Sequence, residues 1–182
     1  MENKPLLDIL PLHEVALTHA VTRGLDSIFF EASGTQVFAS PEAKAAFRDG
    51  WFGSYLTLNA GETFLAIDRA GAVVGYVVGA LQDPASDSRY ADLGYFRDFA
   101  HLTRLYPAHL HMNVAPQHRS AGLGARLIQA FASHAASAGC PGLHVVTGAG
   151  LRNVGFYLRN GFEPLAEAPW KSAAVVLLGR KL

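Results

Sequence analysis

One short glycine-containing segment has the residue types and spacing to bind a phosphate group. Arg119, Gly122 and Gly124 follow one another as R-x-x-G-x-G. Glycines let the backbone come close to a ligand, and the amides of a loop and first helical turn point at whatever lies above them. Pyrophosphate would suit such a site, because it accepts several hydrogen bonds and complements the helix dipole. The alternative is that these glycines only form a tight turn between a strand and a helix.

The same spacing disfavours two common nucleotide-binding motifs. No lysine follows Gly124, as the phosphate loop G-x-x-x-x-G-K-[ST] would require. The three glycines of the dinucleotide fingerprint are also missing. A nucleoside triphosphatase and a Rossmann dehydrogenase are therefore disfavoured.

The elements around the glycine segment form a recognisable order. The sequence predicts a strand over Ala108–Val114, a long helix from Leu123, a second strand over Leu143–Gly148 and a helix near Arg152–Asn160, with further strands after Gly161. A strand, glycine loop, helix and strand in this order make a βαβ crossover, which is expected to be right-handed.

The amino-terminal half is predicted from weaker patterns. Residues Leu12–Ala32 indicate one or two helices, broken near Gly24. Ser40, followed by a proline and a glutamate, is a strong helix start. Two apolar runs, Glu62–Asp68 and Ala72–Leu81, indicate a hairpin of two strands.

Composition limits the classes of function. The 182 residues, half of them apolar, suit a single domain over residues 1–182. Fifteen basic and fifteen acidic residues cancel, which argues against nucleic acid or a membrane as partner. Cys140 is the one cysteine, so a cysteine-rich zinc site is excluded and a reducing compartment is favoured. The first ten residues lack the apolar run of a signal peptide, and we expect a cytoplasmic protein.

A second segment changes the interpretation of the first. NVGFYLRNGF, from Asn153 to Phe162, ends in F-Y-x-x-x-G-F. Together with R-x-x-G-x-G it is similar to the two signature segments of the GNAT superfamily of N-acetyltransferases. The run RLYPAHLHMNV further resembles the strand that enters the cofactor loop in a bacterial group related to the acetyltransferase-like domains of O-GlcNAcases. The resemblance covers Glu62–Phe162.

The resemblance implies both a fold and an activity. The fold would be α/β (α+β): a central mixed, mostly antiparallel sheet of about six to seven strands flanked by helices, in which the strands at Ala108–Val114 and Leu143–Gly148 splay apart. The activity would be acetyl transfer from acetyl-CoA to a primary amine, by direct attack on the thioester. Two alternatives stay open: a non-catalytic acyl-CoA-binding or protein-interaction module with this fold, and a structural domain that binds no cofactor.

The resemblance also implies which residues bind acetyl-CoA. The pantetheine arm would pair with backbone groups of Met112 and Val114, as an added strand would. The pyrophosphate would lie on the amides of Arg119, Ser120, Ala121, Gly122, Leu123 and Gly124. The Arg119 guanidinium either pairs with a phosphate or is solvated. Asn153 stands where relatives have alanine, and it would either cap its helix or touch the pantetheine.

Tyr157 matches the tyrosine that, in many members, protonates the departing thiolate. A phenol with a pKa of about 10 can protonate a thiolate whose conjugate acid has a pKa near 8.5. The alternative is that Tyr157 packs its helix against the sheet beside Phe156.

The sequence departs from the resemblance at the position of a general base, because Asn113 stands where related proteins often have aspartate. His109, His111 and Asn113 alternate and share one face of their strand. His111 is the candidate base, since histidine accepts protons near neutral pH; the alternative is a hydrogen-bonded structural group. Two histidines without a third ligand are weak evidence for a metal, and we expect none.

The acceptor is expected to be a small-molecule or peptide amine. Its recognition would come from the amino-terminal helices, the loop Ser33–Ser40 and the segment Asp83–Phe99. Aromatic side chains of that last segment either line an acceptor pocket or close the core: Tyr90, Tyr95, Phe96 and Phe99. The oligomeric state is left open, a homodimer included.

Overall fold

The computed structural model describes residues 7–182, and the chain divides into two compact units. One comprises Met1–Gly79 and His111–Phe131, and the other Ala80–Leu110 and Ala132–Leu182. The absence of a signal peptide was predicted in part from residues 1–6, which lie outside the described residues. The prediction of a single domain also stays a prediction.

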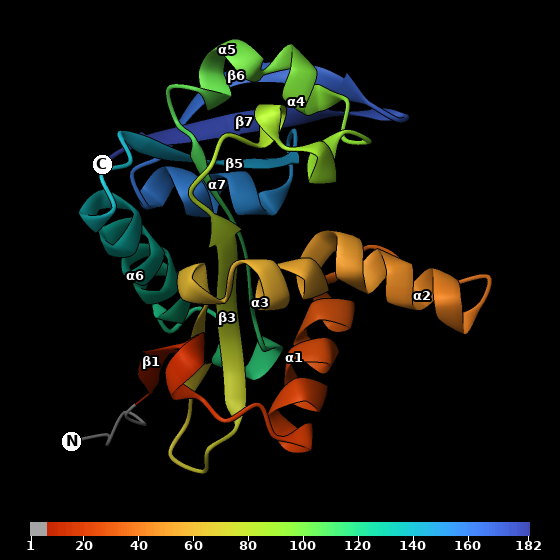
Figure 1. Cartoon of the computed structure of the whole chain (residues 1–182), viewed down its shortest axis with the longest axis vertical. Coiled ribbons are helices and arrows are strands. Elements are labelled where there is room, and N and C mark those ends of the chain that lie inside the picture. Colours follow the sequence, from red (N-terminus) through yellow and green to blue (C-terminus); the bar gives the residue numbers. More distant parts are fainter. Residues whose placement is uncertain (1–6) are drawn as a thin grey trace. The chain divides into compact units, whose positions relative to one another are not determined.

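Within residues 7–182, seven strands form the sheet, in the order β1-β2-β3-β4-β5-β7-β6 (Figure 1). The pairs β1·β2, β2·β3, β5·β7 and β6·β7 are antiparallel, and β4·β5 is parallel. The mixed, mostly antiparallel sheet expected from the sequence is therefore confirmed. The strand β4 (Ala108–Val114) and the helix α6 (Leu123–Ser137) each contribute residues to both units.

The first unit contains the hairpin predicted from the sequence, β2 (Phe64–Ile67) and β3 (Val73–Ala80), and every residue of β3 is buried. Asp68 closes the turn, because its carboxylate accepts from the amides of Ala70 and Ala72. The other elements are β1 (Asp8–Pro11), α1 (His19–Ala32), α2 (Pro41–Arg48), a π-helical turn (Asp49–Gly53), α3 (Ser54–Leu58) and 3₁₀ turns at Leu12–Glu14, Ala60–Glu62 and Pro116–His118.

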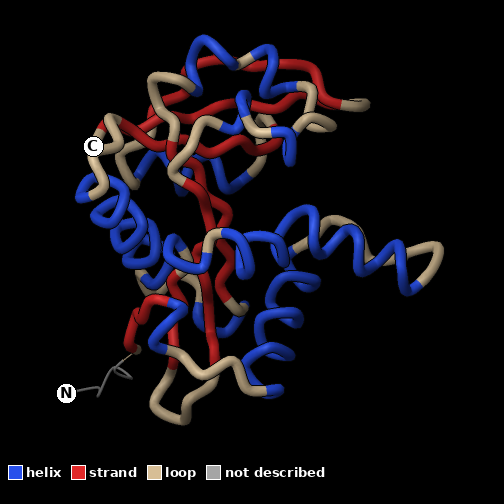
Figure 2. Tube along the Cα trace, viewed as in Figure 1, coloured by secondary structure: helices blue, strands red, loops and turns tan. Residues whose placement is uncertain are grey.

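The helix α2 begins as expected, since the Ser40 hydroxyl accepts from the amide of Ala43. Between α1 and α2 lies the loop that Figure 2 draws in tan. Ser33 and Gln36 hold its first turn, donating to carbonyls of Phe30, Ser33 and Thr35.

Two sequence predictions for this unit were wrong. The helix α1 continues without a break through Gly24, whose missing side chain serves packing: a Cβ there would lie 2.6 Å from Cγ1 of Val73. Residues 12–14 form a separate 3₁₀ turn, and the four-residue strand β1 was not predicted.

The second unit contains β5 (Gly142–Gly148), α7 (Arg152–Arg159), β6 (Glu163–Trp170) and β7 (Ala173–Lys181). The two short helices α4 (Tyr95–Asp98) and α5 (Ala100–Thr103) precede Pro107, and 3₁₀ turns lie at Pro84–Ser86 and Ser88–Tyr90. The pairing of β4 with β5 covers only Ala108↔Leu143 and His109↔His144. A parallel pairing this short is what a splayed strand pair requires.

Over residues 7–182, no helix has both the length and the apolar character needed to span a bilayer.

Candidate functional site

The glycine segment forms a loop with two left-handed residues. Ser120 has φ 62° and Gly122 has φ 77°, and the loop leads directly into α6. Left-handed backbone is unfavourable for a residue with a side chain, so Ser120 marks a position where the loop conformation is imposed. Strain of this kind gathers at ligand clamps.

The amides of this loop are available to a ligand. Arg119 donates its amide to Pro116, and helical pairing begins with the Arg126 amide on the Gly122 carbonyl. Within residues 7–182, none of the amides of residues 120–125 donates to a backbone carbonyl. The start of a 15-residue helix thus presents several free donors and its positive dipole end, which suits pyrophosphate.

The Arg119 side chain makes a contact that the sequence did not predict, and its pairing with a phosphate stays a prediction. Its Nε donates to the carbonyl of Val114 at 2.9 Å. This bond joins the loop to the end of β4, although the residue as a whole is exposed. The carbonyl of Val114 keeps a second lone pair for another donor.

The two predicted pantetheine contacts, Met112 and Val114, both lie on β4 in the first unit. Val114 is buried and Met112 is half-buried. The following amide, of Ala115, donates to Val74 of β3, so the end of β4 is fixed immediately before the loop. The structure therefore brings together, within one unit, all of the predicted cofactor-binding residues except Asn153.

His111 lies on the same stretch of β4, packed between aromatic rings. Its ring centroid is 6.3 Å from that of Phe29 and 6.0 Å from that of Tyr76. Its Nδ1 is buried and has no hydrogen-bond partner within the described residues. Burial lowers the pKa of His111 to about 4, so the imidazole is neutral at pH 7 and is a weak base. The predicted role of general base stays a prediction.

Asn113 makes a structural hydrogen bond. Its Nδ2 donates to the hydroxyl of the buried Tyr76 at 2.8 Å, which leaves its Oδ1 as an acceptor. Burial raises the pKa of Tyr76 well above its usual range, so this hydroxyl is neutral too.

His109, by contrast, belongs to a buried cluster in the second unit. Its Nε2 lies 3.1 Å from the hydroxyl of Tyr90, and its ring is 5.7 Å from that of His144. His144 donates from Nδ1 to the carbonyl of Tyr106. Burial, with the neighbouring His144 adding to it, lowers the pKa of His109 to about 3, and burial lowers that of His144 to about 4. Both are neutral packing groups.

Tyr157 also lies in the second unit, on α7, with its ring between those of Phe156 and Phe162 at 5.3 and 5.4 Å. The ring packs beside Phe156 as the structural alternative requires, and the role of proton donor stays a prediction. The hydroxyl makes no hydrogen bond within residues 7–182 and is free for a ligand. Burial raises the pKa of Tyr157 to about 12, so the phenol holds its proton at neutral pH.

Asn153 does not cap its helix. The N-cap of α7 is Leu151, which makes no side-chain capping bond, and Asn153 instead donates from Nδ2 to Thr147 of β5 at 2.7 Å. The predicted capping role was therefore wrong, and the contact to pantetheine stays a prediction.

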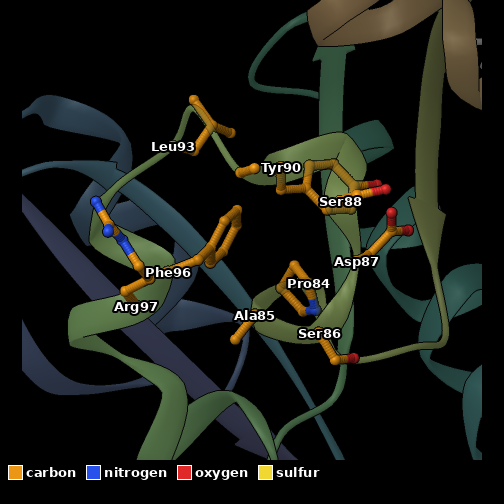
Figure 3. Close-up of a pocket in the computed structure, with 10 residues that line it drawn as sticks. Pro84, Ala85, Ser86, Asp87, Ser88, Tyr90, Leu93, Phe96 and Arg97 are labelled. Atoms are coloured by element: carbon orange, nitrogen blue, oxygen red, sulfur yellow. The ribbon is translucent and has the colours of Figure 1, made fainter.

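The segment Asp83–Phe99 surrounds a pocket of about 410 Å³ (Figure 3). Tyr90 and Phe96 contribute to its lining, whereas Tyr95 and Phe99 are buried elsewhere. Asp87 also lines it, but its carboxylate already accepts from the amide and Nε of Arg89. Two of these aromatic side chains thus line a pocket and two close the core, and the role of the pocket in binding the acceptor stays a prediction.

A smaller pocket, of about 130 Å³, lies in the first unit beside His111 and Asn113. The amino-terminal helices and the loop beside it were predicted to contact the acceptor, but the aromatic side chains of its wall were not identified: Phe29, Phe47 and Trp51. The signal that could have found them is the position of large apolar residues on either side of the loop Ser33–Ser40.

No group of three or more histidine, cysteine, aspartate or glutamate side chains that could hold a metal occurs within residues 7–182. The expectation that the protein uses no metal stays a prediction.

Comparison with known proteins agrees with this arrangement. The model of the acetyltransferase (GNAT) family matches residues 23–162. Among solved structures, SsHAT superposes with a TM-score of 0.70 at 20% identity, covering 97% of this chain and 98% of that one. A polyamine N-acetyltransferase of Drosophila melanogaster gives a TM-score of 0.69 at 15% identity, covering 97% of this chain and 100% of that one. A phosphinothricin acetyltransferase of Sinorhizobium meliloti, solved with acetyl-CoA, gives a TM-score of 0.61 at 19% identity, covering 98% of this chain and 88% of that one.

The seven-stranded mixed sheet of residues 7–182, with its short parallel pair and a glycine loop leading into a long helix, is the fold that the resemblance implied. The chain belongs to the acetyltransferase (GNAT) family. The predicted enzyme class, an N-acetyltransferase, is thereby confirmed, whereas the likeness to the O-GlcNAcase-related group stays a prediction.

Proposed function

We propose that this protein transfers the acetyl group of acetyl-CoA to a primary amine by direct attack on the thioester. The observation that carries the proposal is the segment 119–124 at the start of α6, with its left-handed backbone and with amides that are free from Ser120 onward. These donors fit a pyrophosphate, which accepts several hydrogen bonds and carries the charge that a helix N-terminus favours.

The residues of β4 would hold the pantetheine arm. Met112 and Val114 supply backbone groups at the end of the strand, and the Arg119 side chain fixes that end to the loop. A cofactor held along this line is positioned before the amine arrives, which removes much of the entropic cost of reaction.

Acetyl-CoA supplies the activated acyl group. The amine nitrogen forms a bond to the carbonyl carbon, the carbon–sulfur bond breaks, and the sulfur leaves as a thiolate. The amine loses one proton to water or to His111, and Tyr157 gives one to the thiolate and regains it from solvent. Burial keeps the Tyr157 phenol protonated, and a thiolate desolvated to the same extent would be a stronger base than in water.

The first experiment measures thermal stability with and without acetyl-CoA. A ligand at 100 times its dissociation constant stabilises by about 2.7 kcal/mol, so the parent protein is expected to show a clear rise in Tm. Gly122→Val is expected to abolish most of that rise, because a β-branched residue cannot adopt φ 77° without strain. No rise for the parent at millimolar acetyl-CoA would refute the proposal.

The second experiment measures thiol release with a panel of amines. Tyr157→Phe is expected to lower kcat by about 100-fold and to leave the KM for acetyl-CoA unchanged. An unchanged kcat would remove the proton-donor role. Acetyl-CoA binding without thiol release for any amine would instead identify a non-catalytic module.

We also propose a cytoplasmic location, consistent with the single, half-buried Cys140.

A further inference from the structure

The small pocket beside His111 and Asn113 has a composition that selects among amines. Aromatic rings form much of its wall: Phe29, Phe47 and Trp51. Its remaining lining residues are Ala32, Ser33, Gly34, His111 and Asn113, and none carries a carboxylate or a basic group that is charged at neutral pH. The hydroxyl proton of Ser33 is already engaged, since it is shared between the carbonyls of Phe30 in α1 and Thr35 in the loop.

Charged side chains near this pocket are paired with one another or cover other rings. Arg48 donates from Nε to Asp26 at 2.7 Å, and its guanidinium lies over the ring of Phe52. Lys44 lies over the ring of Phe30, 4.4 Å from its centroid. None of these residues lines the pocket. A ligand with a second ammonium group or a carboxylate would therefore find no counter-charge on the walls.

The apolar wall is backed by a ring cluster that keeps it in shape. Phe29 stacks on Phe52 at 5.3 Å and contacts Phe47 at 5.7 Å, and Phe38 supports Phe47 from the loop. Trp51 remains 37% exposed, so part of its indole is available to a ligand. The pocket volume, about 130 Å³, is close to that of a cavity of about 150 Å³ that accommodates benzene.

We propose that this pocket binds a primary monoamine through its compact aromatic or branched apolar body, and that it rejects amines carrying a second charge. The inference rests on the proposed function and names its acceptor class. His111 and Asn113 flank Met112 on β4, so the pocket adjoins the backbone proposed to hold the pantetheine. The Oδ1 of Asn113 and a neutral imidazole can both accept from an amine N–H.

The absence of a carboxylate also suits the chemistry. A buried ammonium without a counter-charge is costly, so these walls favour the neutral amine, which is the form that attacks a thioester. The one proton that the ammonium loses on binding goes to solvent.

The test compares three probes: 2-phenylethylamine, 1,4-diaminobutane and phenylalanine. Binding to the protein loaded with CoA is measured by ligand-observed NMR, and turnover by thiol release with acetyl-CoA. We expect 2-phenylethylamine to bind, and to react with a kcat/KM at least tenfold above that of either other probe.

Gly34→Leu provides the matched variant. A Cβ at Gly34 meets no atom within 4 Å, so the change should fill the pocket without disturbing the fold, and Gly61→Leu is the control because a Cβ there is equally unhindered. We expect Gly34→Leu to weaken 2-phenylethylamine binding about tenfold or more and to leave the acetyl-CoA stability shift unchanged. Gly34→Asp should raise the relative binding of 1,4-diaminobutane, because it supplies the missing carboxylate.

The outcomes separate the two proposals. Binding of 2-phenylethylamine that Gly34→Leu removes, without turnover, would support the pocket and overturn the proposed catalysis. Preferential use of 1,4-diaminobutane or phenylalanine would overturn the pocket and leave acetyl transfer intact. No binding of 2-phenylethylamine, or binding that Gly34→Leu leaves unchanged, would also overturn the pocket.

Discussion

The buried pair His109 and His144 should make the protein lose stability between neutral and mildly acidic pH. Both side chains are almost fully buried, at 6% and 0% exposure, and their pKa values fall from 6.5 to about 3 and about 4. In the unfolded chain each takes up a proton near pH 6.5, whereas in the folded protein neither does until the pH is far lower. Their contribution to the free energy of unfolding is therefore complete above the pKa of the unfolded chain and is lost as the pH falls below that value.

The size of the effect follows from the two pKa values. Between about pH 7 and about pH 5.5, a histidine that titrates only in the unfolded state lowers the free energy of unfolding by about 1.2 kcal/mol. The pair should therefore cost about 2.5 kcal/mol over that range, a large part of the usual stability of a domain. Most carboxylates remain ionised over this interval, so the histidines dominate the change.

Urea denaturation at the two pH values measures this difference directly. The double variant His109→Gln/His144→Gln should lose about 2.5 kcal/mol less than the parent on acidification, whatever its stability at neutral pH. His101→Gln, at an exposed position, is the control and should behave as the parent does. A double variant that loses as much stability as the parent would refute the assignment of neutral, buried imidazoles.

Two further predictions concern local packing and capping. Gly142→Ala should lower the free energy of unfolding by about 1–3 kcal/mol. The new Cβ would lie 2.6 Å from Cδ1 of Tyr106 and 3.0 Å from the carbonyl oxygen of Arg180. Gly61→Ala is the control and should not lower it, because a Cβ there would have open space around it. Ser40→Ala should lower it by about 1 kcal/mol through loss of the cap on α2, measured by the same denaturation. A loss as large in Ser27→Ala, exposed in the middle of α1, would contradict the capping explanation.

The carboxyl-terminal half could be predicted from the sequence because its signals are local. The run Ala108–Val114 is bounded by a proline and a glycine loop, and the strand has those bounds in the structure. The R-x-x-G-x-G spacing likewise identified the loop before α6, and the left-handed backbone at Gly122 is the reason for a glycine there.

The remaining features depend on contacts between distant residues. Gly24 suggested a helix break, yet only the position of Val73 shows why α1 needs a glycine. The strand β1 has four residues and ends in a proline, which is too short for a periodic pattern. The pocket beside His111 combines α1, α2 and β4, and no spacing within one segment indicates that these meet.

Prolines on the outer strands of the sheet have a consequence for behaviour at high concentration. The order of strands leaves β1 and β6 at the two edges; β1 ends in Pro11, and β6 contains Pro164 and Pro169 with a register shift near Leu165. Proline offers no amide hydrogen to a new neighbour, and an irregular edge fits an incoming strand poorly. Neither rim of the sheet is therefore a good template for edge-to-edge aggregation, and a self-associated form would have to be built from other surfaces.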